Sequence, residues 1–266
     1  MSPLHAVILG IIQGLSEFLP ISSSAHLYVI PTLLGWKYEG VAFDVALHWG
    51  TLLALVAAYG RDWWELFRDA FRGNREALGL LTRIAVASVP AAIAGFLLKD
   101  VAESWLRSLP LQAAMLFVFG FLLWAVDRFR PAGRDEQAPG WGACLAIGCA
   151  QVLALVPGVS RSGVTITAGR GVGLNRVSAA RFSFLLATPI TFGAGLLELR
   201  HLPHDVPLTT IALGVVSAAV VGWLAIRGLI RWLSHAGLGI FFVYRAALAA
   251  FILWRVFSAQ GAAVGG

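Results

Sequence analysis

Near its start the chain reads Gln13-Gly-Leu-Ser-Glu17-Phe-Leu-Pro20-Ile-Ser22-Ser23-Ser24-Ala25-His26, inside an apolar stretch that runs from Leu4 to Pro31. Gln13 and Glu17 are four residues apart, so they share one face of a helix. Pro20 ends that helix, and the serines after it leave hydroxyl and backbone N–H groups without helical partners. The pattern predicts a helical hairpin with a polar break at its centre.

A second apolar stretch, Trp141 to Arg170, is interrupted in the same way by Pro157-Gly-Val-Ser160-Arg161-Ser162-Gly163-Val-Thr165. Backbone broken like this is tolerated at membrane depth only where it is buried in protein or lines a cavity. Both stretches are therefore predicted to be re-entrant helical hairpins.

The chain also resembles itself. Gly10-Ile-Ile-Gln13 matches Gly148-Cys-Ala-Gln151 at an offset of 138 residues. Two further matches follow at offsets of 139 and 125, which pair Phe43–Leu47 with Phe182–Leu186 and Leu116–Phe119 with Phe241–Tyr244.

The composition indicates an integral membrane protein. Of the 266 residues 58% are hydrophobic and 13% are charged, and the mean hydropathy is +0.78. A soluble domain carries about twice that charged fraction. Six segments are predicted to span the membrane, several of them near the short end of the permitted range: Val41–Tyr59, Thr82–Leu98, Leu109–Val126, Phe182–Leu197, Thr209–Ile226 and Gly239–Phe257.

The repeat and the spans together predict an all-α polytopic fold in one transmembrane domain, residues 1–266. Each half, 1–135 and 136–266, is one re-entrant hairpin followed by three spans. Because three is odd, the second half enters the membrane in the opposite sense. This is an inverted-topology repeat, which places a substrate site between broken helices.

The net charge of +6 is interpreted as a topology signal and not as nucleic-acid binding. If residues 61–83 are cytoplasmic, thirteen arginines fall inside and five cations outside. The first hairpin then dips in from outside, the second from the cytoplasm, and both termini are external. The inside set is Arg61, Arg68, Arg72, Arg75, Arg83, Arg128, Arg130, Arg134, Arg170, Arg176, Arg181, Arg227 and Arg231; the outside set is Lys37, Lys99, Arg107, Arg200 and Arg255.

No cleaved signal peptide is expected, because residues 1–12 contain no Lys or Arg. Cys144 and Cys149 are five positions apart and do not face each other on a helix, so neither a disulfide nor a metal site is expected from them.

The first break concentrates the carboxylate of Glu17, several hydroxyls and the imidazole of His26 within fourteen positions. A polar helix cap with a satisfied histidine would explain this in a soluble protein. Within a membrane, ionisable groups are costly and usually functional, which favours a reactive site.

Arg161 in the second break has no acidic neighbour in sequence, so its counter-charge is Glu17, another distant carboxylate or an anionic ligand. A purely structural ion pair with Glu17 is the alternative. The planar guanidinium suits bidentate binding of phosphate, and a helix that starts at the turn adds N–H groups and a positive dipole end. The break therefore predicts a phosphate cradle without a P-loop sequence.

These two motifs resemble the undecaprenyl-pyrophosphate phosphatase family, bacterial membrane enzymes associated with bacitracin resistance. Gln13 and Glu17 fit its (E/Q)-x-x-x-E motif, and the second break fits its P-G-x-S-R-S-x-x-T motif in full. The resemblance continues through Phe43 and Phe182–Ala187 and so covers essentially the whole chain.

The resemblance implies hydrolysis of undecaprenyl pyrophosphate to the monophosphate and inorganic phosphate, which recycles the lipid carrier for cell-wall synthesis. The protein would lie in the bacterial inner membrane with its site open to the external side. Ser23 is the expected nucleophile and His26 the general base or the group that protonates the leaving oxygen, with direct attack by water as the alternative. Glu17 would orient His26 or bind a cation, and Arg161 would clamp the phosphoryl group. Ser22, Ser160, Ser162, Gly163 and Thr165 complete the expected phosphate site.

A divalent cation, Mg²⁺ or Ca²⁺, is expected at Glu17 and Gln13. Many members of the family have Glu in place of Gln13 and Gly in place of Ala25, and Gln removes a charge that would help to hold the cation. The expected partners are the polyprenyl pyrophosphate substrate and membrane lipids, and a homodimer is also considered. A polyprenyl-phosphate flippase is the alternative function, because transporters share the inverted repeat; the set Ser23, His26 and Arg161 favours an enzyme.

Overall fold

The computed structural model describes residues 1–36, 40–104, 108–130, 133–136, 138–198 and 206–264. Over these ranges the chain is helical, apart from one isolated bridge between Arg134 and Leu174. In chain order the elements are α1 (Pro3–Phe18), α2 (Ser23–Leu33), α3 (Val41–Phe71), α4 (Arg75–Ser104), α5 (Leu109–Phe129), α6 (Trp141–Gln151), the 3₁₀ turn η2 (Val152–Leu155), α7 (Arg161–Gly171), α8 (Arg176–Glu198), α9 (Leu208–Leu233) and α10 (Gly239–Val264).

Six of the described helices have the length and hydropathy to cross a membrane, and they are the six that the sequence predicts: α3, α4, α5, α8, α9 and α10. The chain is a multi-pass membrane protein. The helices that carry the spans extend over 20 to 30 residues and are longer than the apolar segments that the sequence marks. Hydropathy marks only the apolar part of each helix; α3 continues past Tyr59 through a polar turn in which Arg61 and Glu65 pair at 2.8 Å.

The two interrupted stretches form pairs of short helices, α1 with α2 and α6 with α7. In each pair a serine with a left-handed backbone immediately precedes the second helix: Ser22 with φ 77° and Ser160 with φ 75°. They are the only non-glycine residues with positive φ in the described part of the chain. Like Gln13 and Gln151, they are 138 residues apart. Such strained backbone persists only where its surroundings hold it in place.

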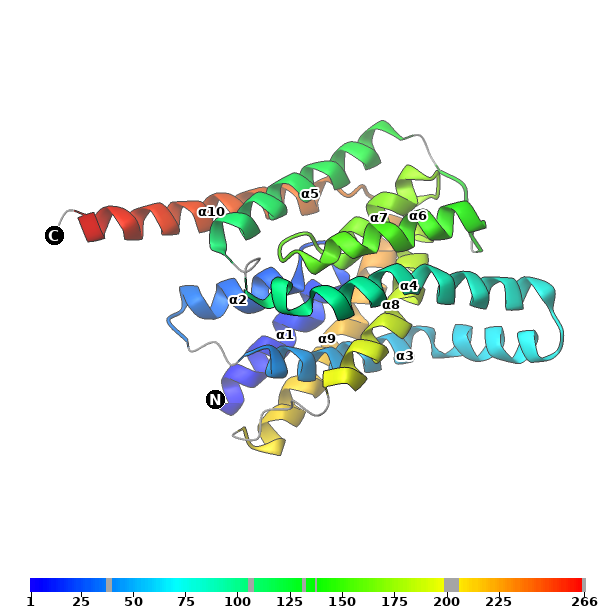
Figure 1. Cartoon of the computed structure of the whole chain (residues 1–266), viewed down its shortest axis with the longest axis horizontal. Helices are drawn as coiled ribbons and strands as arrows, with labels where there is room; N and C mark the ends of the chain where they lie inside the picture. The colour runs from blue at the N-terminus through cyan, green and yellow to red at the C-terminus, as the bar shows by residue number, and fades with distance from the viewer. Residues whose placement is uncertain (37–39, 105–107, 131–132, 137, 199–205, 265–266) are drawn as a thin grey trace.

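The short helices are packed tightly against the spans. α1 lies along α9, and α6 lies along α4 (Figure 1). Each contact needs a glycine, because a Cβ at Gly10 would overlap the carbonyl of Gly214, and one at Gly148 would overlap the carbonyl of Ala87. Gly10 and Gly148 are the matched first residues of the internal repeat.

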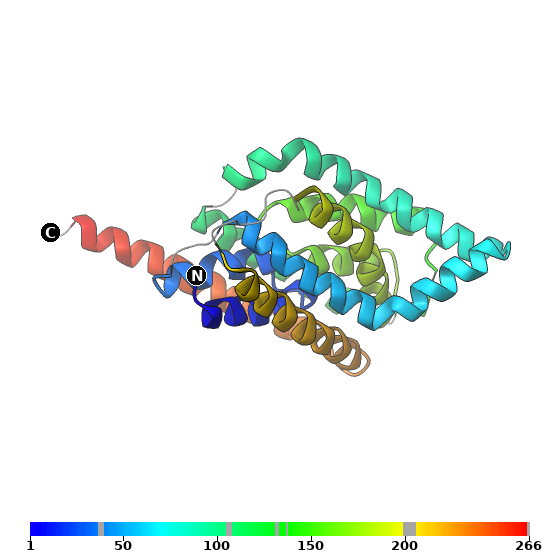
Figure 2. The same cartoon turned by 90° about the horizontal axis from the view of Figure 1, so that it is seen from below.

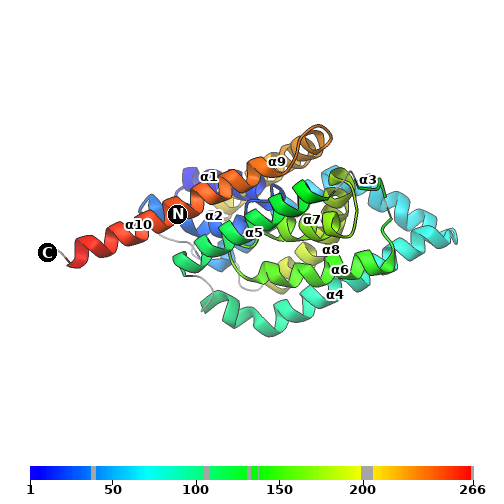
Figure 3. The same ribbon diagram turned by 90° about the horizontal axis from the view of Figure 1, so that it is seen from above.

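The remaining spans enclose the two breaks. α5 lies beside α10, and α3 packs against α8 and α9 (Figure 3). The turn between α3 and α4 lies at one end of the molecule, and the last turns of α10 lie at the opposite end (Figure 2). The breaks meet inside this arrangement, where the Ser162 hydroxyl donates to the carbonyl of Leu19 over 3.2 Å.

Candidate active site

Glu17, next to the last residue of α1, is the point at which the two breaks meet. Its Oε1 accepts a hydrogen bond from Nη2 of Arg161 over 2.7 Å. Its Oε2 accepts from the hydroxyl of Ser23 over 2.7 Å and from Nε2 of Gln13 over 3.2 Å. The side chain is only 7% exposed, so this ion pair is shielded from bulk water. One carboxylate thus holds a hydroxyl from the first break and a guanidinium from the second.

Arg161 is the first residue of α7, and it is placed there by the cap of that helix. The Ser160 hydroxyl accepts from the backbone N–H of Gly163 over 3.2 Å. Nη1 of Arg161 donates to the carbonyl of Ser183 on α8 over 3.2 Å, while Nη2 reaches Glu17. The guanidinium is therefore held on two sides beside the N-terminus of a helix, where anions are favoured.

The hydroxyls of the second break divide into two groups. Ser160 and Ser162 are 3.3 Å apart at the cap of α7. Thr165 is fully buried, and its hydroxyl contacts the hydroxyl of Ser183 at 2.6 Å and donates to the carbonyl of Arg161 over 2.8 Å. Thr165 and Ser162 therefore tie α7 to α8 and to the first break.

Ser23 is half-buried at the first position of α2, and its partner is Glu17. Next to it, the Ser22 and Ser24 hydroxyls are 3.2 Å apart, and Ser24 is exposed. The sequence predicts His26 as the general base for Ser23 or as the group that protonates the leaving oxygen. In the structure the Ser23 hydroxyl donates to Glu17, because the end of α1 brings this carboxylate over the start of α2.

His26 is buried, and both of its ring nitrogens are occupied. Nδ1 lies 2.7 Å from the carbonyl of Ser22, and Nε2 lies 2.6 Å from the hydroxyl of Tyr244 on α10. A carbonyl can only accept, so Nδ1 donates to Ser22, and Nε2 shares the second hydrogen bond with the hydroxyl of Tyr244. The ring of Tyr244 also stacks on His26, with centroids 5.6 Å apart.

Sequence reasoning missed His48, Tyr244 and Ser183, which complete the surroundings of the site. His48 on α3 places Nε2 3.5 Å from Oε2 of Glu17, and its side chain is 33% exposed. An ionisable residue in the middle of a predicted span was the available signal for His48. Ser183 and Tyr244 lie in matched segments of the internal repeat, but those matches do not mark them as site residues.

The expected divalent cation fits the oxygen atoms that the site offers. The described residues contain no group of three His, Cys, Asp or Glu side chains that could hold a metal ion. Oε1 of Gln13, however, is buried without a hydrogen-bond partner beside the carboxylate of Glu17. Mg²⁺ is commonly held by one or two carboxylates together with substrate phosphates and water, and here Glu17 supplies one carboxylate and Gln13 an amide oxygen.

The amino-acid sequence is similar to those of known proteins. The family described as "Bacitracin resistance protein BacA" matches residues 6–251. The chain is 46% identical over 258 residues to the undecaprenyl-diphosphatase of Pelotomaculum thermopropionicum, covering 95% of this chain and 97% of that protein. It is 47% identical over 257 residues to that of Trichlorobacter lovleyi, covering 93% and 94%. It is 44% identical over 265 residues to undecaprenyl-diphosphatase 2 of Stutzerimonas stutzeri, covering 95% and 98%.

Proposed function

The chain belongs to the BacA family of undecaprenyl-diphosphatases, and from that membership we propose how its two joined breaks hydrolyse undecaprenyl diphosphate. The enzyme is a membrane phosphatase that releases inorganic phosphate and leaves undecaprenyl phosphate, the lipid carrier used in cell-wall synthesis. One observation supports the proposed mechanism above the others. Glu17 holds the Ser23 hydroxyl and the Arg161 guanidinium at once, each over 2.7 Å.

Ser23 attacks the terminal phosphorus, and Glu17 accepts the hydroxyl proton along the hydrogen bond already present. The bond between Ser23 Oγ and phosphorus forms as the bond to the bridging oxygen breaks, and undecaprenyl phosphate leaves. Water then hydrolyses the phosphoserine, which releases inorganic phosphate and restores Ser23. His26, when protonated on both ring nitrogens, donates its Nε2 proton to the leaving oxygen once the substrate separates its ring from Tyr244, while Nδ1–H stays on the Ser22 carbonyl; catalytic hydrogen bonds often form only in the substrate complex. In the alternative route, His26 activates water for direct attack.

Arg161 binds the transferring phosphoryl group. The Arg161 guanidinium turns from Glu17 toward the phosphate oxygens and stabilises the negative charge that builds on them. Ser22, Ser160 and the N–H of Gly163 bind the same group at the starts of α2 and α7. Ser162 and Thr165 support this cradle from behind, because their hydroxyls are engaged with Leu19 and Ser183.

A divalent cation would be held by Glu17 and Gln13, where it would neutralise charge on the diphosphate. Detergent-purified protein is expected to release phosphate from undecaprenyl diphosphate, to stop in excess EDTA, and to recover when Mg²⁺ or Ca²⁺ is added. Gln13→Glu adds a ligand charge, so it should lower the cation concentration needed for half-maximal activity several-fold. Phosphate release that is indifferent to EDTA would remove the cation from the proposal, and no release under any condition would contradict the activity.

The finer architecture that we propose is the inverted repeat of 1–135 and 136–266, each with one re-entrant hairpin and three spans. The matched glycines Gly10 and Gly148, the matched serines Ser22 and Ser160, and the matched packing of α1 on α9 and α6 on α4 support it. The arginine count supports an orientation with residues 61–83 in the cytoplasm of a bacterial inner membrane and the active site open to the outside. Of the external cations, Lys37, Arg107 and Arg200 lie outside the described residues.

Thiol labelling tests this orientation. Phe71, at the end of α3, and Leu208, at the start of α9, are 91% and 79% exposed. With Cys144 and Cys149 replaced by alanine, Phe71→Cys should be shielded from a membrane-impermeant reagent in intact cells, whereas Leu208→Cys should react. Both sites should react after the membrane is permeabilised. Reaction of both from outside, or of Phe71→Cys alone, would rule out the proposed orientation.

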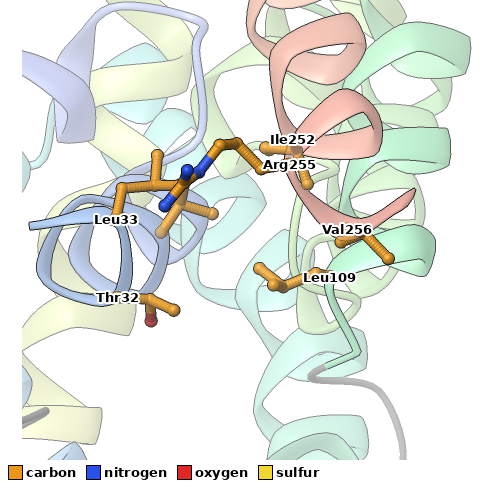
Figure 4. A pocket seen from close by; sticks show the side chains of 7 residues that line it. Thr32, Leu33, Leu109, Ile252, Arg255 and Val256 are labelled. Carbon is orange, nitrogen blue, oxygen red and sulfur yellow. The ribbon is translucent and has the colours of Figure 1, made fainter. Parts of the chain in front are cut away.

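The prenyl tail of the substrate lies in an apolar groove of about 350 Å³ between α2, α5 and α10. Figure 4 shows Thr32 and Leu33 on one wall, Leu109, Ile252 and Val256 on the other, and Arg255 reaching across from α10 toward Leu33. α2 begins at Ser23 and lines the groove from Val29 to Leu33, about 9 to 15 Å along its axis. A tail that follows α2 away from the reacting phosphate therefore enters the groove.

A tryptophan in the groove should discriminate between substrates by their length. Leu33→Trp is expected to raise KM for undecaprenyl diphosphate about tenfold, equivalent to about 1.4 kcal/mol. It should leave hydrolysis of a diphosphate with a single isoprene unit unchanged, because that substrate does not reach the groove. Leu97→Trp, at a 69% exposed position on α4, is the matched control. An equal effect on both substrates would place the tail elsewhere.

A further inference from the structure

Arg245 on α10 is fully buried, and its side-chain hydrogen bonds within the described residues all go to backbone carbonyls. A guanidinium has five N–H donors in a fixed fork, and a buried charge is costly unless its donors are satisfied. A residue of this kind inside a membrane protein is usually functional. Its acceptors come from three segments of the chain: Leu116 at 2.9 Å and Met115 at 3.2 Å on α5, Pro20 at 3.1 Å in the first break, and Gly158 at 2.9 Å and Val159 at 3.1 Å in the second.

Two of these segments carry the reacting residues. Pro20 lies two residues before Ser22, and Gly158 lies two residues before Ser160. Ser22 and Ser160 are the two strained positions of the backbone, and they lead directly into Ser23 and Arg161. A single guanidinium therefore holds both breaks at equivalent positions: Pro20 is three residues before Ser23, and Gly158 is three residues before Arg161.

We propose that Arg245 is a positioning residue, which sets the separation of Ser23 and Arg161 so that both reach one phosphoryl group. This inference rests on the proposed roles of those two residues. The Glu17–Arg161 ion pair alone cannot set the separation during the reaction, because the phosphate competes with Glu17 for Arg161. Arg245 contacts only carbonyls that take no part in the reaction, so its hold persists when the substrate binds.

The neighbouring helices are shaped around this side chain. A Cβ at Gly120 on α5 would lie 3.1 Å from Nε of Arg245 and 3.3 Å from its Cβ and Cδ. A Cβ at Gly163 on α7 would lie 3.1 Å from Nη1. Both distances are shorter than an ordinary contact, so the absence of a side chain at Gly120 leaves the space that Arg245 occupies. The preceding residue, Tyr244, contacts His26 from the same turn of α10.

The experiment compares Arg245→Lys with Gly120→Ala. Lysine keeps the charge but has a single ammonium group, which cannot bridge three segments. We expect kcat to fall about tenfold while KM changes less than threefold, because Arg161 still binds the phosphate. Gly120→Ala crowds Arg245 without changing any group of the site, and we expect a smaller fall of kcat with the same unchanged KM. Gly228→Ala on α9, where a Cβ would meet nothing within 4 Å, should behave as wild type.

A purely structural role for Arg245 predicts a different outcome. Activity would then follow the folded fraction, so cooling each variant well below its melting temperature would restore kcat fully. Full recovery on cooling, a wild-type kcat in Arg245→Lys, or a rise in KM as large as the fall in kcat would overturn the proposal. If Arg245→Lys does not fold, Gly120→Ala decides: wild-type kcat in that variant would overturn the proposal, and a kcat loss that persists on cooling would support it.

Discussion

Ser23→Ala is expected to lower turnover of undecaprenyl diphosphate by at least about a thousandfold, equivalent to about 4 kcal/mol of activation free energy. The substitution removes the oxygen that forms the covalent bond to phosphorus. Binding of the lipid should change little, because Arg161 and the N–H groups at the start of α7 still hold the diphosphate. Phosphate release and equilibrium binding, measured on the same purified variant, separate the two effects.

Ser24→Ala is the matched control for this change. Ser24 is the next residue of α2, is exposed, and contacts only the Ser22 hydroxyl. Its loss should cost about 0.5–1.5 kcal/mol, the range for one hydrogen bond, and Ser22→Ala should behave similarly. Equal and modest losses at all three serines would mean that water attacks phosphorus directly. His26→Ala would then be the most damaging substitution in the first break.

Arg161→Lys is expected to lower kcat/KM about a hundredfold, equivalent to about 2.7 kcal/mol, although the charge is retained. The arginine fork reaches Glu17 with one arm and the carbonyl of Ser183 with the other. Lysine offers a point charge that cannot hold both, and it cannot bind two phosphate oxygens side by side. Steady-state kinetics over a range of substrate concentrations provide the measurement.

Arg170→Lys provides a contrast to that substitution, because Arg170 is also a buried arginine of α7 but pairs with Asp127 at 3.1 Å, away from the site. Its replacement should alter stability and leave the kinetics of the folded protein near wild type. Wild-type kcat/KM in Arg161→Lys would exclude the bidentate clamp from the mechanism.

The sequence predicted the six spans and the two broken helix pairs. Hydropathy identifies the spans, and Pro20 and Pro157 identify the breaks. Both are local features of the sequence, so they can be recognised without a structure. The meeting of Glu17 and Arg161 was also predictable as one alternative, since a lone arginine at membrane depth needs an anion.

The partners of individual atoms were not predictable. His26 is three residues from Ser23 and was the nearest base in sequence, but its ring turns back to the carbonyl of Ser22. Glu17 accepts the Ser23 hydrogen bond, because the backbone reverses direction between α1 and α2. No residue pattern in the sequence specifies the direction of that reversal. Tyr244 is 218 residues from His26 and lies in an apolar helix, so only the packing of α10 reveals the contact.

The bonds of Arg245 also impose an order on biogenesis. Both breaks are synthesised well before α10. Until α10 inserts, the carbonyls of Pro20 and Gly158 lack the guanidinium that joins them, although Glu17, Ser23 and Arg161 are already present. On the role proposed for Arg245, a nascent chain that stalls before α10 carries Glu17, Ser23 and Arg161 without the guanidinium that sets their separation, and we expect it to hydrolyse the lipid more slowly than the complete chain.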